Sequence, residues 1–301
     1  MERKDSLNLG IIGNCKSVAL INEDSSIDWC CLPQFDSPSV FGEILDDNIG
    51  GNFKVECDAS YSITQAYIAD TCILCTRFSN GNDAFELLDF MPRYKKEDGI
   101  FYSPPEIVRV FKYISGKPTF QVIYDPRLEY AIGETKNFVK DNFIVSIVDD
   151  KHYDTLFLYT DFDKDKILSG TQIQLTKDHF VTVSYNEKIK VPNLQKTHFE
   201  FERTKVYWLN WCHKTPTFSN YNQEILRSAM TLKLMTYEKT GAVLAAATTS
   251  LPETIGEVRN WDYRFCWIRD ASMVIKVIAK LGHNQIVKNF IRYIIDLIPD
   301  K

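Results

Sequence analysis

The densest group of side chains able to do chemistry lies between Arg259 and Asp270. These twelve residues include two Trp, one Tyr, one Phe, three Arg and two Asp. Aromatic faces stack on the C–H surfaces of pyranose rings, while guanidinium and carboxylate groups bind pairs of hydroxyls through charge-assisted hydrogen bonds. The segment therefore has the composition of a sugar-binding pocket.

Asp270 also has two structural interpretations. An Asp at the start of a helix accepts hydrogen bonds from backbone N–H groups that lack a partner, so Asp270 could be an N-cap. It could equally form a structural ion pair with Arg269. The local chemistry alone leaves these two interpretations and sugar binding open.

Most of the chain before this segment has the pattern of β-strands. Between Leu7 and about Tyr207, short β-branched and aromatic runs alternate with turn residues, with no convincing helix between them. The clearest hairpin joins 72–78 to 84–90 through Asn80 and Gly81, both expected at positive φ. The pattern predicts antiparallel sheets packed face to face. Further strands are expected at 107–114, 119–124, 138–148, 155–159, 180–185 and 198–206.

The hydrophobic period changes from two to about 3.6 near Asn220. Further helices are expected from about 270 to 282 and over 284–297, each with an apolar stripe. These two stripes need partners that the four remaining residues do not supply. The sequence therefore predicts a helical domain that is interrupted at Lys301. The first helix is predicted over 221–239, with its stripe at Ile225, Ala229, Leu232 and Thr236.

Composition and charge exclude several classes of protein. The 35 basic and 40 acidic residues give a net charge of -5, and the chain has no long basic cluster, which argues against nucleic-acid and membrane-surface binding. The longest purely apolar run, 242–247, is far shorter than the roughly 18 residues of a membrane-spanning helix. Because the charged N-terminus lacks the apolar region of a secretory signal, we expect a cytoplasmic protein.

No cofactor or metal ion is predicted. Cys72 and Cys75 have the spacing of a metal-binding or redox pair, but they lie in a strand-like run, where positions three apart point to opposite faces. None of the five His residues has metal-ligand spacing, and the sequence contains no nucleophile elbow and no Gly-rich phosphate loop.

Two stretches far apart in the chain resemble glycoside hydrolase family 15, the glucoamylase and trehalase-like enzymes. Residues 260–270, NWDYRFCWIRD, preceded by TTSLPE at 248–253, are similar to the signature of that family. Residues 12–21 and 26–41 resemble the opening of its trehalase-like N-terminal domain. The two matches follow the order of the family and together account for essentially the whole chain.

The resemblance implies a multidomain fold, β then α. An N-terminal antiparallel β-sandwich, of the supersandwich type, is followed by the first helices of a truncated (α/α)6 barrel. The implied boundaries are a sandwich domain at 1–200, a helical linker at 201–220 and the incomplete glycosidase barrel at 221–301.

The resemblance also implies an activity and its binding residues. The expected activity is inverting hydrolysis of α-glucosidic bonds in an α-glucan, an oligosaccharide or trehalose. Arg269 and Asp270 are expected to bind sugar hydroxyls, and Trp267 and Tyr263 to line the same subsite. The loop at 248–253 is expected to shape the barrel mouth. Supporting roles are expected for Trp261, Asp262 and Arg264.

The catalytic residues are not assigned. An inverting glycosidase needs one carboxyl group to protonate the leaving oxygen and a second to activate a water. The resemblance implies that both glutamates lie beyond Lys301, so we expect this chain alone to be inactive. Glu253 and Glu257 lie near the motif, but two Glu near any motif are expected in a chain with 40 acidic residues.

Three functional hypotheses remain open. The chain is a truncated glycosidase, a non-catalytic carbohydrate-binding or scaffold protein, or one half of a split enzyme whose second chain supplies the rest of the barrel. The loops at 24–28 and 35–38 also match the family. We interpret them as turns, in which Asp and Ser hydrogen-bond to nearby backbone, with contact to the barrel entrance as the alternative.

Overall fold

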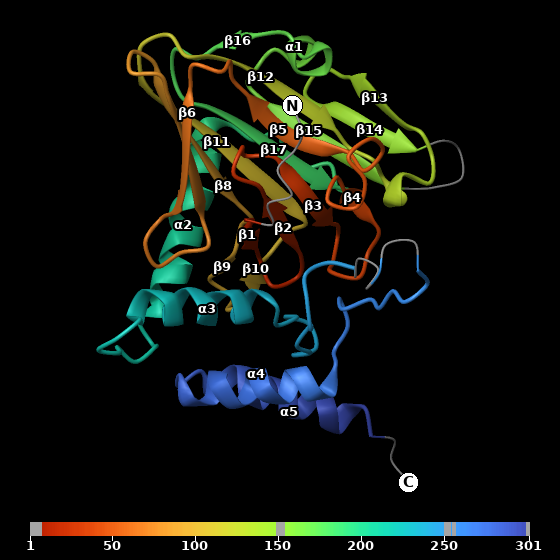
Figure 1. The fold of residues 1–301 in the computed structure, drawn as a ribbon, viewed down its shortest axis with the longest axis vertical. Coiled ribbons are helices and arrows are strands. Elements are labelled where there is room, and N and C mark those ends of the chain that lie inside the picture. The colour runs from red at the N-terminus through yellow and green to blue at the C-terminus, as the bar shows by residue number, and fades with distance from the viewer. Residues whose placement is uncertain (1–7, 149–153, 250–253, 255–256, 299–301) are drawn as a thin grey trace.

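The computed structural model describes residues 8–148, 154–249, 254 and 257–298. Figure 1 shows a region of stacked sheets that contains the first half of the chain. The last helices form a separate layer beside one end of these sheets. The order of the elements is therefore β first and α last, as predicted.

The first sheet is antiparallel and begins with short, buried strands near the N-terminus. In the following list each strand pairs with the strand named after it, and the last one, β4, pairs only with β3. Its strands are β1 (Gly10–Gly13), β2 (Val18–Ile21), β3 (Ile27–Cys31), β5 (Asn52–Glu56), β12 (Thr119–Asp125) and β16 (Ile173–Gln174), with β4 (Ser39–Phe41).

The second sheet is also antiparallel and contains most of the strands in the middle of the chain. A two-stranded hairpin of β9 (Tyr94–Lys95) and β10 (Phe101–Tyr102) lies outside both sheets. In spatial order the second sheet contains β13 (Thr135–Val139), β14 (Ile144–Val148), β15 (Thr155–Thr160), β17 (His179–Tyr185), β11 (Glu106–Ser115), β8 (Ala84–Phe90), β7 (Leu74–Ser79) and β6 (Ser62–Tyr67).

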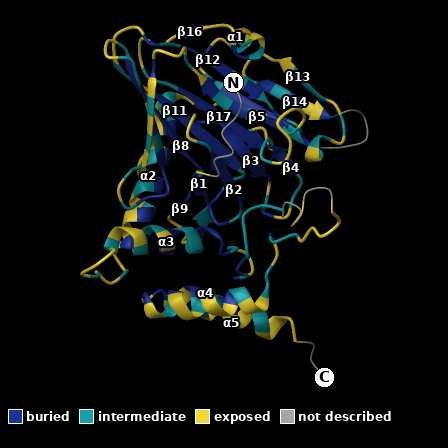
Figure 2. Ribbon diagram, in the orientation of Figure 1, coloured by how far each residue is buried: buried dark blue, intermediate teal, exposed yellow. Residues whose placement is uncertain are grey.

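Both sheets contribute their inner faces to one hydrophobic core. Phe120 of the first sheet has its ring centroid 4.9 Å from that of Phe85 and 5.3 Å from that of Phe111, both in the second sheet. The strands appear mostly dark blue in Figure 2 because alternate side chains point into this core. The predicted pair of facing antiparallel sheets is confirmed.

Two predicted strand features were wrong in detail. The run at 138–148 is not one strand but two, β13 and β14, separated by a turn in which Lys140 N donates to Phe143 O. In the hairpin of β7 and β8, only Gly81 has positive φ. The Asn80 side chain accepts hydrogen bonds from the backbone N–H groups of residues 82 and 83, so a four-residue loop replaces the expected two-residue turn.

The strand predicted at 198–206 is wrong, because these residues belong to helix α2 (Leu194–Cys212). Asn193 caps the helix by accepting a hydrogen bond from Lys196 N at 2.8 Å. Aromatic and β-branched residues favour strands, but here burial follows a helical period. The buried side chains are Thr197, Glu200, Thr204, Trp208, Trp211 and Cys212.

Three further helical segments are shorter than α2. Two of them lie between strands, and the third follows α2. The 3-10 turn η1 (Glu129–Ala131) and helix α1 (Lys164–Ser169) both fall where only strands were expected. Helix α3 (Asn222–Leu234) confirms the first predicted helix but ends five residues earlier than predicted. Thr236, expected in its stripe, instead forms an isolated bridge with Val243.

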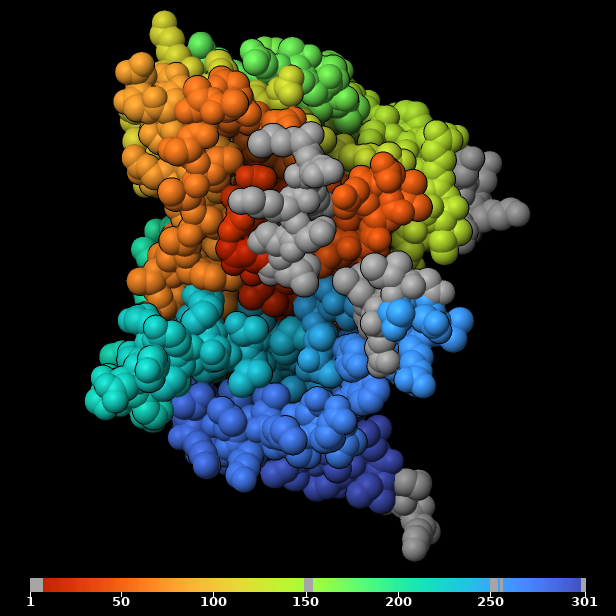
Figure 3. Space-filling model, viewed as in Figure 1, coloured from red at the N-terminus to blue at the C-terminus, as the bar shows by residue number. Residues whose placement is uncertain are grey.

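The last two predicted helices are confirmed as α4 (Ile268–Lys280) and α5 (Asn284–Asp296). They lie side by side and are joined by a short turn at Gly282, which has a φ of 82° (Figure 1). Figure 3 shows α3 packed between the sheets and these two helices. A second hydrophobic core, which includes Trp208, Met230 and Ile278, joins α2, α3 and α4.

One face of α4 and α5 remains exposed. Val277, Ile291 and Ile295 are 46%, 51% and 60% exposed, so these positions lack partners as predicted, whereas Ile278 and Leu281 of the α4 stripe are buried in the second core. Figure 2 shows both helices largely in yellow and teal. None of the described helices is long and apolar enough to cross a membrane.

Candidate functional site

The segment rich in Trp, Arg and Asp is held against an extended piece of backbone that follows α3. Ala245 N donates to Phe265 O at 3.2 Å, and Ala246 N donates to Tyr263 O at 2.9 Å. The indole Nε1 of Trp29, on β3, donates to the carbonyl oxygen of Ala247 at 2.9 Å. These bonds connect the segment through 245–247 to the first sheet.

Arg264 connects the same segment directly to the sheet region. Its side chain is only 5% exposed and forms an ion pair with Asp262 at 2.7 Å. Its Nη1 donates to the carbonyl oxygens of Ser37 at 2.7 Å and Phe35 at 3.3 Å. The guanidinium carbon also lies 5.6 Å from the ring centroid of Tyr130. Arg264 thus fills the space between the segment and the loop after β3.

The environment of Asp262 favours its ionised form. Partial burial raises the pKa of a carboxyl group, but the hydrogen bonds from the Arg264 side chain and backbone outweigh burial here and hold the pKa of Asp262 below its ordinary value. The pair therefore stays ionised at neutral pH.

Tyr263 and Trp267 form the aromatic part of the site. Their rings are stacked, with centroids 5.3 Å apart and planes 26° apart. Trp267 is the N-cap residue of α4, and its side chain makes no capping hydrogen bond. Both side chains are half-buried, so their exposed parts are available to a ligand ring.

Arg269 and Asp270 lie in the first turn of α4 and face solvent. Arg269 Nη2 lies 3.1 Å from Asp270 Oδ2, and the two side chains are 70% and 38% exposed. The N-cap interpretation of Asp270 is wrong, because α4 begins at Ile268 and Trp267 occupies the cap. The ion-pair interpretation is confirmed. An exposed pair contributes only about 0–1 kcal/mol, so these groups remain available to hydroxyls at little cost.

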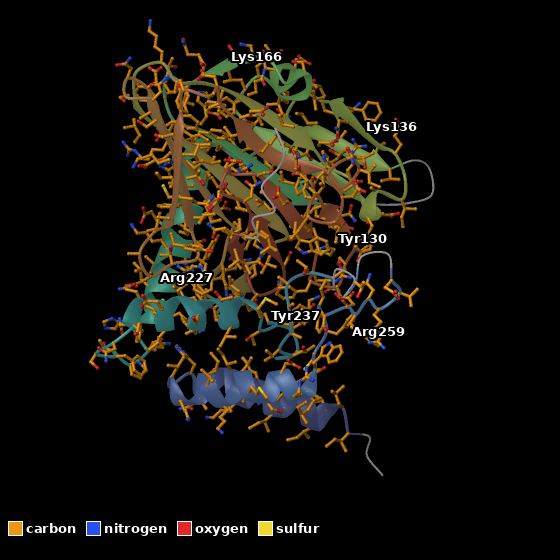
Figure 4. The ribbon with its side chains drawn as sticks, viewed as in Figure 1. Tyr130, Lys136, Lys166, Arg227, Tyr237 and Arg259 are labelled. Atoms are coloured by element: carbon orange, nitrogen blue, oxygen red, sulfur yellow. The ribbon has the colours of Figure 1, made fainter. Side chains whose placement is uncertain are left out.

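The other predicted residues differ in their surroundings. Trp261 is 49% exposed. Among the described residues, no side-chain hydrogen bond or ring contact joins Arg269 and Asp270 to Tyr263 and Trp267, although all four lie within eight residues of sequence. Figure 4 shows Arg259 on the link that leads into this segment. Residues 250–253 of the predicted mouth loop lie outside the described residues.

Of the two nearby glutamates, the structure describes only Glu257, which does not have the surroundings of a catalytic acid or base. Glu257 is exposed, and its backbone N donates to Thr254 O in a turn. Glu253 lies outside the described residues. No group of three or more His, Cys, Asp or Glu in the described ranges could hold a metal ion.

Sequence reasoning missed part of the support for this site. The loop at 35–38 does form the predicted turn, in which Ser37 N donates to Gln34 O, and it also receives the Arg264 side chain. Contact between this loop and the motif had been the alternative interpretation. Tyr130 carried no local signal, and Trp29 belongs to the N-terminal stretch of the resemblance at 26–41, so only the tertiary fold brings the two near the motif.

Comparison with known proteins agrees with both resemblances. Residues 4–149 match the family described as "Trehalase-like, N-terminal", and residues 219–296 match "Glycosyl hydrolases family 15". The Thermoplasma volcanium trehalase is 32% identical over 96% of this chain and 47% of its own length. The Thermoplasma acidophilum trehalase is 32% identical over 93% of this chain and 48% of its own length.

A third trehalase is also similar to this chain over most of this chain's length. The Mycolicibacterium smegmatis trehalase is 28% identical over 96% of this chain and 46% of its own length. This chain therefore spans about half the length of the curated relatives that it matches. On these matches the chain belongs to glycosyl hydrolases family 15 and carries the trehalase-like N-terminal region.

Proposed function

We propose that residues 261–270 are the glucose-binding part of a glycoside hydrolase site that acts on an α-glucoside, with trehalose as the first candidate. The observation that carries the proposal is the Arg269–Asp270 pair, which is exposed at the start of α4 within a family 15 match. The relatives are named trehalases, which supports trehalose ahead of an α-glucan or a longer oligosaccharide.

Each residue has a distinct part in this proposal. Arg269 and Asp270 hold neighbouring hydroxyls, since a guanidinium donates and a carboxylate accepts. The stacked rings of Tyr263 and Trp267 provide an apolar surface for the sugar ring. Asp262 and Arg264 fix the segment against the loop at 35–37, and Trp261 has a supporting role. In the proposed reaction, which inverts configuration, the acid and base are carboxyl groups that we do not assign.

The proposal extends to the domain organisation. Residues 1–200 form the sandwich domain, 201–220 the helical linker, and 221–301 the opening of an (α/α)6 barrel. The second core, in which α3 and α4 pack together, supports a helical unit in this region. The exposed apolar residues of α4 and α5 favour further helices, from this protein or a second chain, packing against them.

Sugar binding can be measured on the 301-residue chain by titrating tryptophan fluorescence with trehalose, maltose and glucose. Charge-assisted hydrogen bonds contribute roughly 1.5–3 kcal/mol each, so Asp270→Asn and Arg269→Lys should each weaken trehalose binding by about tenfold or more. Asp296→Asn, at the exposed end of α5, is the matched control and should leave binding unchanged. Wild-type affinity in both site variants would contradict the proposed site.

An enzymatic assay for released glucose separates hydrolysis from binding alone. Glucose release that Asp270→Asn lowers supports the glycoside hydrolase. Binding of trehalose without any release of glucose is the result we expect of this chain alone, and it fits a truncated glycosidase as well as the carbohydrate-binding alternative.

A further inference from the structure

A cavity of about 780 Å³ lies beside helix α2. Its wall comes from the β9–β10 hairpin, α2, the end of α3 and the start of α5, and it contains none of residues 261–270. Its volume falls in the range of small-molecule pockets, about 300–1,000 Å³. Tyr237, one of its wall residues, lies between the sheets and the C-terminal helices in Figure 4.

The wall of this cavity is positively charged, although the chain as a whole is acidic. Five of its side chains are basic and two, Glu202 and Glu238, are acidic. Glu238 is already paired, because Arg93 Nη1 lies 2.5 Å from its Oε2. The basic residues are Arg93, Lys95, Arg203, Lys214 and Lys233.

Lys214 and Lys233 share one end of the cavity. Among the described residues, neither forms an ion pair with a carboxylate. Both act on His283, whose ring stacks on Trp211 with centroids 3.9 Å apart and accepts or donates a hydrogen bond at Thr215 Oγ1. Burial, followed by the charges of Lys233 and Lys214, lowers the pKa of His283 to about 4. Two ammonium groups therefore lie near a neutral imidazole, and neither is paired with a carboxylate of the described residues.

Apolar surface lies next to these two lysines. Val206 is 51% exposed and lies on the same wall as Tyr207 and Trp211. In helix α2, residues 206 and 211 are separated by about 7–8 Å along the axis, at 1.5 Å per residue. That distance suits one ring or a short hydrocarbon chain beside a charged group.

We propose that this cavity is a separate binding site for a small organic anion, whose carboxylate or phosphate group lies between Lys214 and Lys233 and whose apolar body packs against Val206, Tyr207 and Trp211. An ordinary pair of surface lysines is surrounded by water and needs no ligand. These two differ because they border an apolar cavity of ligand size, where a bound anion gains both charge pairing and apolar contact.

The proposal can be tested by calorimetric titration of the full chain with three matched probes. Phenyl phosphate and phenylacetate carry an anionic group, whereas 2-phenylethanol has a similar apolar body without charge. At least one anion should bind about tenfold or more tightly than 2-phenylethanol, and the preferred anion identifies the ligand class. Equal affinity for all three probes, or no binding of either anion, overturns the proposal.

Two variants locate the binding site. Lys214→Gln and Lys233→Gln should each weaken anion binding by about tenfold, since each loses one charge-assisted contact. Lys276→Gln, on the exposed surface of α4, is the matched control and should bind as the wild type does. Unchanged binding in both cavity variants would place the anion elsewhere and overturn the assignment.

An NMR titration of the His283 ring gives an independent measurement. A bound anion offsets the charges of Lys214 and Lys233, so the preferred probe should raise the pKa of His283 towards its ordinary value. The neutral probe should leave this pKa unchanged. Anion binding without a change in the His283 titration would show that the anion lies outside this cavity.

Discussion

Two arginines five residues apart in the motif have opposite surroundings. The Arg264 side chain is 5% exposed and the Arg269 side chain 70%. Arg264 forms hydrogen bonds with both carboxylate oxygens of Asp262 and reaches the carbonyl oxygen of Ser37. The family resemblance assigned binding to Arg269 and a supporting role to Arg264, but the residue types alone do not separate them, because the difference depends on the tertiary position of the loop at 35–37.

Replacing Arg264 by Lys should therefore destabilise the protein more than the same change at Arg269. Lys keeps the charge but loses the planar fork that contacts Asp262 and Ser37 together. We expect Arg264→Lys to lower the free energy of unfolding by about 1–3 kcal/mol in urea titrations. Arg269→Lys should change it by about 0.5 kcal/mol or less. Equal effects of the two substitutions would contradict the structural role of Arg264.

Helix α2 shows how an element was assigned to the wrong class. Its sequence contains aromatic and β-branched residues that favour a strand locally. In the structure Trp208, Trp211 and Cys212 of this helix join the second core, and Thr204 Oγ1 accepts a hydrogen bond from Arg93 N at 3.1 Å. Two features indicate a helix here: Asn193 as its N-cap, and a period of about 3.6 residues between the positions that are buried.

Two acidic side chains lie in the interface between α2 and the second sheet. Glu106 of β11 is almost fully buried, and its Oε2 has no hydrogen-bond partner among the described residues. Burial, followed by the charge of Glu200 on α2, raises the pKa of Glu106 to about 8 against the opposing effect of Lys196. Glu106 is therefore largely protonated at neutral pH.

This raised pKa predicts a pH-dependent stability. Between about pH 4.5 and pH 8 the folded state holds a proton that the unfolded state has lost, so stability falls as pH rises through this range. The contribution of one such group is at most about 1.4 kcal/mol per pH unit. Glu106→Gln removes the titration, and its stability relative to the wild type should increase from about pH 5 to pH 8 in urea titrations.

Glu97→Gln, in the exposed loop between β9 and β10, is the control for this prediction. It should leave the pH dependence unchanged. If Glu106→Gln and the wild type lose stability in parallel as pH rises, Glu106 ionises normally in the folded protein and the interface does not hold it protonated.

At the scale of the whole molecule, the sequence predicted the order of the parts better than their contacts. Strand alternation located most strands of the second sheet but only β12 of the first, and the change of period located α3, α4 and α5. The attachment of the motif to the sheets was not predicted, because it depends on single long-range bonds such as Trp29 Nε1 to Ala247 O and Arg264 to Ser37. Bonds of this kind have no local periodicity.

The exposed face of α4 and α5 leads to a prediction about association. Val277, Ile291 and Ile295 present adjacent apolar surface to solvent, and contiguous surface of this kind drives association in water. The 301-residue chain should therefore self-associate as its concentration rises, measured by sedimentation velocity.

Ile291→Glu and Ile295→Glu should each shift the equilibrium towards the monomer by about tenfold, because a charge at the contact must be desolvated. Ile132→Glu, at an exposed position in the sheet region, should have no such effect. If the chain stays monomeric at every concentration, this apolar face alone does not drive association. If the chain associates and neither α5 variant affects the equilibrium, the contact lies on another surface.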